Sequence, residues 1–362
     1  MSKPNLDRFK LETSFGDGSV THKIYTSMRR APVQTTWNDS KIIGSGGFGV
    51  VILQEADGGQ LRAVKKIYNR NGKMDYSMEV SVMAEVAHRK DLFVQLLGWY
   101  ANTEFLFIAM EYMEYGDLTQ YFNGAGTGRC SAMTARDITG QLLEGLATLH
   151  ELNIAHRNIK PQVRIAHPFP LVYHSVLTII QNVLVASPNP IWVKIADFGA
   201  SNRTRDNLLH TRTGTQGYMA PEVIGLLPRR YQSDGYTIAV DMWSLGCLVH
   251  ELLTGQVPFL EIEGAEDWAR EFDSESELME PQTDLAKLMS FCNDEVEFPT
   301  DILRQCLVSG TAIEFLKAIL VANPKSRAAA KGALGSAWLV QEEEPKRAEE
   351  PEREEEPERE ET

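Results

Sequence analysis

The feature that most constrains the fold is a change in hydrophobic periodicity near Gly116. From residue 37 to about 111, apolar residues come in short β-branched runs such as 50–53, interrupted by one helical stretch at 78–87. Beyond Gly116 they recur at helical spacing, as in residues 135–149, 240–253 and 312–320. We therefore expect an α+β protein in which a small β-rich lobe with one main helix precedes a larger, mainly helical lobe.

A glycine-rich segment lies between two strand-like runs of the small lobe. It fits the pattern G-x-G-x-x-G-x-V through Gly44, Ser45, Gly46, Gly47, Phe48, Gly49 and Val51. Glycines let backbone amides approach phosphate oxygens and let the loop fold over a nucleotide, which a Cβ would obstruct. A dinucleotide-binding fingerprint needs a helix directly afterwards, whereas residues 50–53 continue as a strand. The pattern therefore predicts a phosphate-binding loop outside the dinucleotide-binding class.

Lys65 is the candidate cation for the nucleotide phosphates. It follows Ala63 in a strand-like run, sixteen residues after Gly49. There its ammonium group could neutralise the α- and β-phosphates if a carboxylate holds it in place. Glu79, near the start of the predicted helix, is the favoured partner, and Glu85 is the alternative. A buried Lys–Glu pair would orient the amine, but it requires the helix to dock correctly.

The order and spacing of motifs from about Lys41 to Leu339 resemble the eukaryotic protein kinase superfamily of the serine/threonine type. The second half of the chain supplies His156-Arg157-Asn158-Ile159-Lys160-Pro161-Gln162, Asp197-Phe198-Gly199 and Ala220-Pro221-Glu222. The resemblance implies a two-lobed protein kinase fold. It also implies ATP and Mg²⁺ as cofactors, and transfer of the γ-phosphate of ATP to Ser or Thr of a protein substrate.

The resemblance also assigns roles to individual residues. The hinge at 109–113 would receive adenine through main-chain hydrogen bonds, with Met110 as gatekeeper. The nucleotide would be surrounded by the glycine loop together with Ala63, Lys65, Met110, Glu111, Met113 and Asp117. Asn182 and Asp197 would hold magnesium, and Lys160 would contact the transferring phosphate.

Asn158 stands where the family has its catalytic aspartate. That aspartate accepts the proton of the substrate hydroxyl, whereas an amide oxygen can align the hydroxyl but is not a useful proton acceptor. General-base catalysis contributes about 10²–10⁴-fold, so a rate of roughly 1–100 s⁻¹ would fall to about 10⁻⁴–1 s⁻¹. Two hypotheses follow: a weakened serine/threonine kinase, or a pseudokinase that acts as a nucleotide-binding scaffold or allosteric partner. A sequencing error or single-base change over an active enzyme is a third explanation.

Residues 163–181 are a candidate insertion. The family's magnesium-binding Asn lies five residues after the catalytic aspartate, but Asn182 lies 24 residues after Asn158. Removing these 19 residues, or 57 nucleotides, restores the family spacing and keeps the reading frame. Codons available for Val163, for 177–178 and for Gln181 match the start, branch point and end of an intron. We hypothesise a retained intron; a real regulatory insertion is the alternative, although its apolar content is unlike a solvated loop.

Threonines follow Asp197 in the segment that would regulate activity. Thr211 and Thr213 are the candidate regulatory phosphorylation sites, because a phosphate there could pair with Arg157 and order the segment. Thr215 is more suited to contacting Lys160 than to accepting phosphate.

Two predictions concern the scaffold of the large lobe. The carboxylate of Asp241 should accept backbone amides of residues 156–162, which correspond to the family's catalytic loop. Arg327 should pair with Glu222 and thereby support the fold rather than the chemistry.

The predicted kinase domain spans residues 37–339, with lobes at about 37–111 and 116–339, and it has two flanks. Residues 1–36 form an N-terminal extension with a possible short strand at 23–25 and no assigned function. Residues 340–362 form an acidic tail, and its repeated run from Glu349 has no apolar residue to bury, so we expect disorder. The tail either docks to a partner or only solvates the chain end.

Net charge and composition bear on partners and location. The tail holds twelve Glu and four Lys or Arg, so it carries −8 of the total −14 and leaves −6 to the rest. A mildly acidic body gives no electrostatic case for binding nucleic acid or an anionic membrane. No signal peptide and no apolar stretch near the roughly 18 residues of a membrane span are evident. The four scattered cysteines suit free thiols, so we expect a cytoplasmic or nuclear protein with ATP and a protein substrate or binding partner.

Overall fold

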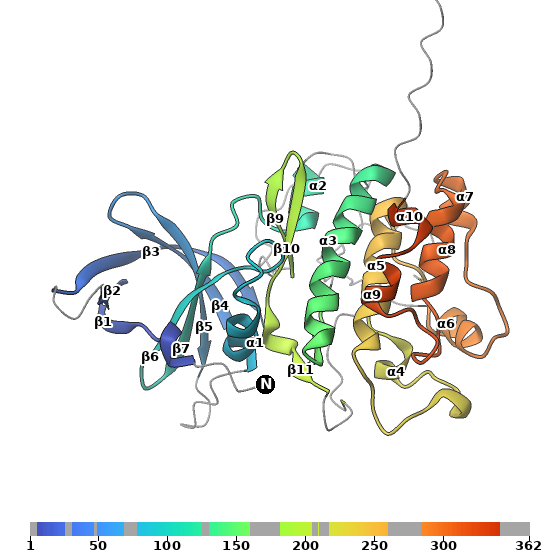
Figure 1. Ribbon diagram of the computed structural model, residues 1–362, viewed down its shortest axis with the longest axis horizontal. Coiled ribbons are helices and arrows are strands. Elements are labelled where there is room, and N and C mark those ends of the chain that lie inside the picture. The colour runs from blue at the N-terminus through green and yellow to red at the C-terminus, as the bar shows by residue number, and fades with distance from the viewer. Residues whose placement is uncertain are drawn as a thin grey trace, which may run out of the picture.

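The computed structural model describes residues 6–25, 31–46, 49–68, 78–124, 130–159, 182–204, 209, 217–259 and 284–340. Figure 1 shows a β-rich lobe made from the first third of the chain beside a helical lobe made from the rest. The predicted two-lobed α+β architecture is therefore confirmed. The predictions for Gly47, Phe48, Lys160, Thr211, Thr213, the segment 163–181 and the tail from 341 lie outside the described residues.

The small lobe is an antiparallel sheet of seven strands in the order β1-β2-β3-β4-β5-β7-β6. Its strands are β1 (Glu12–Gly16), β2 (Ser19–Ile24), β3 (Val33–Gly46), β4 (Gly49–Ala56), β5 (Leu61–Tyr68), β6 (Leu96–Ala101) and β7 (Phe105–Glu111). The predicted strand at 23–25 overlaps the end of β2. The sheet therefore extends into the N-terminal residues 1–36.

One helix, α1 (Met78–Val86), packs on this sheet, close to the predicted range of 78–87. Most of its side chains are buried, because it contacts β6, the 3₁₀ turn η1 (Leu6–Phe9) and the turn η2 (Phe198–Ala200). α1 thus lies where the small lobe meets the start of the segment that follows Asp197.

The large lobe is mainly helical and also contains short strands. Its helices and 3₁₀ turns are α2 (Leu118–Gly124), α3 (Ala132–Glu151), α4 (Pro221–Ile224), η3 (Arg229–Tyr231), α5 (Ala239–Thr254), α6 (Leu285–Cys292), α7 (Asp301–Gln305), α8 (Gly310–Ile319), α9 (Ala330–Ala333) and α10 (Ala337–Val340). Its strands are β8 (Ile154–Ala155), β9 (Val183–Pro188), β10 (Ile191–Ile195) and β11 (Asn202–Arg203). The hairpin of β9 and β10 lies against α3, and β11 pairs with β8.

The helix α5 is the centre of the large lobe. It packs between α3 and α8, and nearly all of its side chains are buried. One hydrophobic cluster runs from Val80 in α1 through Phe198 to Trp243 and Trp338, so the two lobes share apolar contacts. Full burial of an aromatic side chain such as Phe198 stabilises the fold by roughly 1.5–3 kcal/mol.

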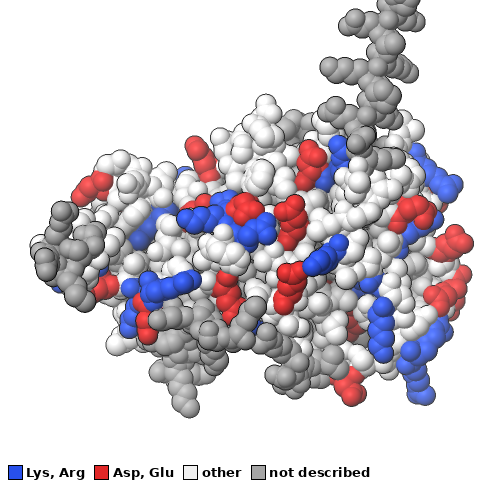
Figure 2. Space-filling model, viewed as in Figure 1, with Lys and Arg blue, Asp and Glu red and all other residues white. Residues whose placement is uncertain are grey.

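Charged side chains of both signs are interspersed on the molecular face shown in Figure 2. Lys and Arg lie beside Asp and Glu on both lobes, so the described part of this face has no broad basic patch. In the described ranges no helix is long and apolar enough to cross a membrane. The four cysteines are free thiols.

Candidate active site

A cavity of about 410 Å³ lies between the two lobes. Many of the residues predicted to bind the nucleotide line it: Val51, Ala63, Lys65, Glu79, Met110, Glu111, Met113, Asp117 and Asp197. Lining residues that the sequence analysis did not assign to the nucleotide site include Lys41, Ile42, Ile43, Leu184 and Ala196. Leu184 could have been recognised from strand alternation, because it is half-buried between the buried Val183 and Val185.

Lys65 lies on β5 and carries the ammonium group at the centre of the cavity's polar end. Its Nζ donates to both carboxylate oxygens of Glu79, at 2.8 and 3.0 Å, and to Oδ1 of Asp197 at 2.6 Å. The predicted Lys65–Glu79 pair is confirmed. Glu85, the alternative partner, instead pairs with Arg203 at 2.6 Å.

The three charged groups at this end of the cavity shift one another's pKa. Burial by itself would lower the pKa of Lys65, but the charges of Glu79 and Asp197 outweigh it and raise that pKa. Burial raises the pKa of Glu79, although Lys65 opposes it. Burial would likewise raise the pKa of Asp197, but the charge and hydrogen bond of Lys65 lower it overall. Two carboxyl groups therefore share the one ammonium of Lys65.

Asn182 and Asp197 flank the open end of the β9–β10 hairpin. Val183 pairs with Ile195, and the amide of Ala196 donates to the carbonyl of Asn182 at 2.9 Å. The side-chain Nδ2 of Asn182 donates to the carbonyl of Asn158 at 2.5 Å, although 24 positions separate the two residues. Oδ1 of Asn182 is buried and has no hydrogen-bond partner among the described residues. The contact places the residues on either side of the predicted insertion next to each other.

A divalent metal ion fits the chemistry of this pair. Mg²⁺ prefers oxygen ligands and is held by one or two protein groups together with substrate phosphates. Asp197 offers a carboxylate, and Asn182 offers the unpartnered amide oxygen. Lys65 lowers the pKa of Asp197, and the resulting carboxylate charge also favours a cation.

Helix α5 contacts the predicted catalytic loop through the carboxylate of Asp241. Asp241, which is fully buried, accepts the backbone amides of His156 and Arg157 at 2.9 and 2.7 Å and the ring of His150 at 3.0 Å. The prediction for Asp241 is confirmed. Arg157 has a left-handed backbone, with φ of 66°, and its guanidinium contacts the carbonyl of Ala200 at 2.5 Å. The half-buried Asn158 follows directly.

Two residues predicted to surround the nucleotide have other polar partners as well. The carboxylate of Glu111 accepts from Lys194 at 2.7 and 2.9 Å and from the amide of Gln95 at 2.8 Å, which couples the hinge to β10. Asp117 caps α2 by accepting from the amide of Gln120 at 2.8 Å, while the Gln120 side chain accepts from the Asp117 amide at 3.4 Å. This reciprocal arrangement is a capping box and fixes the start of α2.

The described glycine-loop residues lie at the turn of the β3–β4 hairpin. Gly46 pairs with Gly49, while Gly44, Ser45, Gly46 and Gly49 are not among the residues lining the cavity. Gly49 has a φ of 131°, and a Cβ there would lie 2.2 Å from the carbonyl oxygen of Lys66. Glycine is therefore required at position 49 by the hairpin itself.

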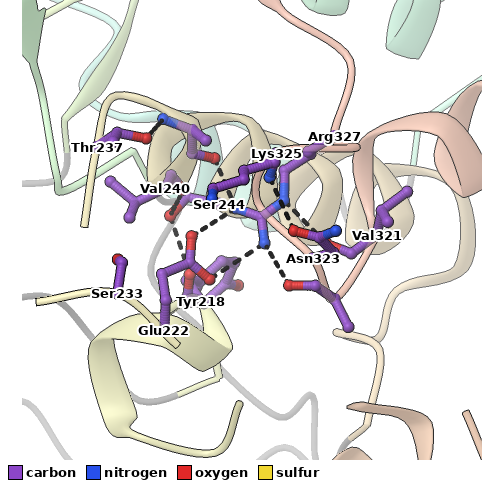
Figure 3. Close-up of polar contacts among 12 residues, drawn as sticks. Tyr218, Glu222, Ser233, Thr237, Val240, Ser244, Val321, Asn323, Lys325 and Arg327 are labelled. Carbon is purple, nitrogen blue, oxygen red and sulfur yellow. Dashed lines mark hydrogen bonds and ion pairs between the residues drawn. The ribbon is translucent and has the colours of Figure 1, made fainter. Parts of the chain in front are cut away.

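Arg327 connects the start of α4 with the start of α5 and with the segment after α8. Figure 3 shows its guanidinium directed at the carboxylate of Glu222, which it meets at 2.7 and 3.1 Å. The predicted pair is confirmed. Its backbone acceptors belong to two segments: the carbonyl of Ala239 at the start of α5, and the adjacent carbonyls of Val321 and Ala322 after α8. The arginine therefore acts as a structural junction.

A family model, "Protein kinase domain", matches residues 37–165 and 177–339. The chain therefore belongs to the protein kinase family. The match is interrupted within 163–181, the segment predicted to be an insertion.

The chain is similar to several kinases, among them proteins named as serine/threonine kinases. RAD53 of Saccharomyces cerevisiae is 29% identical over 310 residues, which cover 83% of this chain and 32% of RAD53. The kinase cds1 of Schizosaccharomyces pombe is 28% identical over 82% of this chain and 57% of its own length. Calcium/calmodulin-dependent protein kinase type 1 of Caenorhabditis elegans is 26% identical over 85% and 76%. The chain thus spans about a third of RAD53.

A solved structure supports the same fold. The crystal structure of Rad53 1-466 in complex with AMP-PNP superposes with a TM-score of 0.58 at 28% sequence identity. The match covers 84% of this chain and 65% of that one.

Proposed function

We propose that this chain binds Mg²⁺·ATP between its lobes and transfers the γ-phosphate to Ser or Thr of protein substrates, at a rate reduced by Asn158. The observation that carries the proposal is the cluster of Lys65, Glu79 and Asp197 at the polar end of the cavity, with contacts of 2.6 to 3.0 Å. Phosphoryl transfer depends chiefly on positioning and charge neutralisation. Lys65, Glu79 and Asp197 support both requirements among the described residues.

Each residue of the cluster has a definable task. Lys65, oriented by Glu79, would neutralise the α- and β-phosphates, and Val51, Ala63 and Met110 would enclose the base. Asp197 and Asn182 would hold a divalent cation, which when bound neutralises charge on the transferred phosphate. We also propose that Lys160 contacts that phosphate and that Thr211 or Thr213 regulates the segment, as the family resemblance implies.

Asn158 determines how much of the rate remains. Its amide oxygen can accept a hydrogen bond from a substrate hydroxyl and so orient it, but it takes up no proton at neutral pH. The nucleophilic hydroxyl must then lose its proton to water or to the phosphate. We therefore expect a rate about 10²–10⁴-fold below that of an aspartate enzyme.

A pseudokinase is the second candidate, and Asn158 is the observation that favours it. In that case the same cavity would bind nucleotide without useful turnover. The fold would then serve as a scaffold or allosteric partner for another protein.

We propose in addition that residues 163–181 are a retained intron and are absent from the functional protein. The interruption of the family match within this segment supports the proposal. The contact of Asn158 with Asn182 also supports it, because the flanking residues already lie together. Transcript sequencing tests it: reads that lack these 57 nucleotides are expected, and their complete absence from all transcripts would refute it.

The test of the function is transfer of labelled phosphate from ATP to a generic Ser/Thr protein substrate. Both the full chain and the chain lacking 163–181 should be assayed. Each is compared with its Asn158→Asp and Lys65→Met variants. We expect the parent to exceed the Lys65→Met background, and Asn158→Asp to raise the rate about a hundredfold or more.

Binding of Mg²⁺·ATP is measured alongside to separate the outcomes. If the parent binds ATP but only Asn158→Asp transfers phosphate, the chain is a pseudokinase. If neither the parent nor the Asn158→Asp variant binds ATP or transfers phosphate, while circular dichroism reports a folded protein, the proposed function is wrong.

A further inference from the structure

The residues before β1 form a strap between the sheet and α1, which we call the N-terminal brace (residues 6–11). In Figure 1 this dark-blue segment lies beside β6 and α1. It precedes β1, at one edge of the sheet, and reaches β6, at the other edge. Lys10 forms a parallel bridge with Trp99 of β6, so the brace connects the two edges of the sheet.

The brace is hydrogen-bonded to β6 at two points. The amide of Leu11 donates to the carbonyl of Trp99 at 2.8 Å, and the indole Nε1 of Trp99 donates to the carbonyl of Leu6 at 3.0 Å. Gly98 leaves the space for this approach, since a Cβ there would lie 2.7 Å from Cγ of Leu11. The sequence of β6 is therefore matched to the brace.

The brace also contacts α1 directly. The Arg8 guanidinium donates to the carbonyl of Ala84, in the last turns of α1, at 3.4 Å. The side chains of Leu6 and Phe9 are half-buried against the apolar cluster that includes the buried side of α1. The far end of α1 thus has a partner in the N-terminal residues.

The hairpin that follows anchors the brace to the sheet. Val20 and His22 of β2 are buried, and His22 contacts Thr13 and Arg62, each at 2.8 Å. Burial and the charge of Arg62 lower the pKa of His22 to about 4, so the ring is neutral at physiological pH. The end of the brace at Leu11 is therefore anchored to the sheet by the hairpin that follows it.

α1 needs such support. It has nine residues, and isolated helices shorter than about 12–15 residues are marginal in water. The Glu79–Lys65 pair, to which α1 contributes Glu79, is buried, so its own attraction is largely offset by the cost of burial. Contacts outside the pair must therefore fix the helix.

We propose that the N-terminal brace is a positioning element that holds α1 where Glu79 reaches Lys65. Leu6, Arg8 and Leu11 act through α1 and β6 and do not touch the nucleotide cavity. The consequence for ATP rests on the proposed function, whereas the effect on α1 does not.

The test compares the full chain with deletions of residues 1–10 and, as a control, 1–5, which leaves the brace intact. Hydrogen exchange of the α1 amides and the Kd for Mg²⁺·ATP are measured at a temperature where circular dichroism reports folded protein. Deleting 1–10 should speed α1 exchange about tenfold and weaken ATP binding about tenfold, the scale of one or two lost net hydrogen bonds. Exchange in α5 should not change.

A point variant keeps the test valid if the deletion does not fold. Trp99→Phe retains the ring but removes the hydrogen bond to Leu6, and we expect α1 exchange to rise about threefold or more. Trp192→Phe is the control for loss of an indole hydrogen bond, because the indole of the more exposed Trp192 donates to the carbonyl of Asp91 at 2.7 Å away from the brace. Unchanged α1 exchange in both Trp99→Phe and the folded deletion would overturn the inference. A parent that fails to bind ATP refutes the proposed function, but the exchange data still decide on the brace.

Discussion

Replacing Arg327 by methionine should be among the most destabilising single changes in the large lobe. The guanidinium has five N–H donors, and the structure gives five acceptor contacts between 2.7 and 3.3 Å. Two acceptors are oxygens of Glu222 and three are backbone carbonyls. The arginine side chain is 0% exposed and that of Glu222 is 6% exposed, so water cannot replace the lost donors (Figure 3).

The magnitude follows from leaving a buried charge without its partner. Removing one member of a buried ion pair costs about 3–5 kcal/mol. A domain of this size loses roughly 2–4 °C of Tm per kcal/mol, so we expect Tm to fall by about 6–20 °C. Arg327→Lys should also lose several degrees, because three donors cannot satisfy five acceptor positions.

Thermal and urea unfolding followed by circular dichroism measures the effect. The double variant Arg327→Met/Glu222→Leu should be clearly more stable than Arg327→Met alone, since it removes the unpaired carboxylate. Lys331→Met is the control, because Lys331 pairs with Glu151 at 3.0 Å on the surface and should leave Tm nearly unchanged. An Arg327→Met variant as stable as the Lys331→Met control would refute the reasoning.

Two further predictions concern titration and metal binding. Burial raises the pKa of Glu251 to about 7, so the folded state favours its protonated form, and the stability gained at low pH is lost as pH rises from about 4.5 towards 7. The free energy of unfolding of the parent should therefore decline between pH 5 and pH 7.5, and Glu251→Gln should remove roughly 2 kcal/mol of that decline. Urea unfolding at the two pH values measures the difference. The same pH dependence in parent and variant would contradict the prediction. Asn182→Ala should raise the Mg²⁺ concentration needed for half-maximal ATP binding by about tenfold or more, measured by titration at fixed ATP. Equal Mg²⁺ dependence in parent and variant would remove Asn182 from the metal site.

Several structural predictions from the sequence were local or depended on motif spacing. Helical periodicity located α1, α3, α5 and α8 to within three residues at each end. Motif resemblance identified the pairing of Arg327 with Glu222 and the amide-accepting role of Asp241, because these residues serve the fold and their spacing is characteristic.

The choice between Glu79 and Glu85 shows the limit of that reasoning. Six residues are about 240° apart on an α-helix, so only one of the two can face Lys65. Nothing in the pattern of α1 says how the helix is rotated against the sheet. The sequence favoured Glu79, and the docking of α1 decided it while directing Glu85 to Arg203.

The sequence by itself determined the two-lobed fold, the order of the motifs and the presence of Asn158 where a general base is expected. Only the tertiary structure brought Asn182 to Asn158 across 24 positions, placed Ala196 in the cavity, and laid the N-terminal brace against β6 and α1. The physical reason is that periodicity and motifs record contacts close in sequence. Contacts between distant segments depend on strand register and helix docking, which the whole packed chain decides.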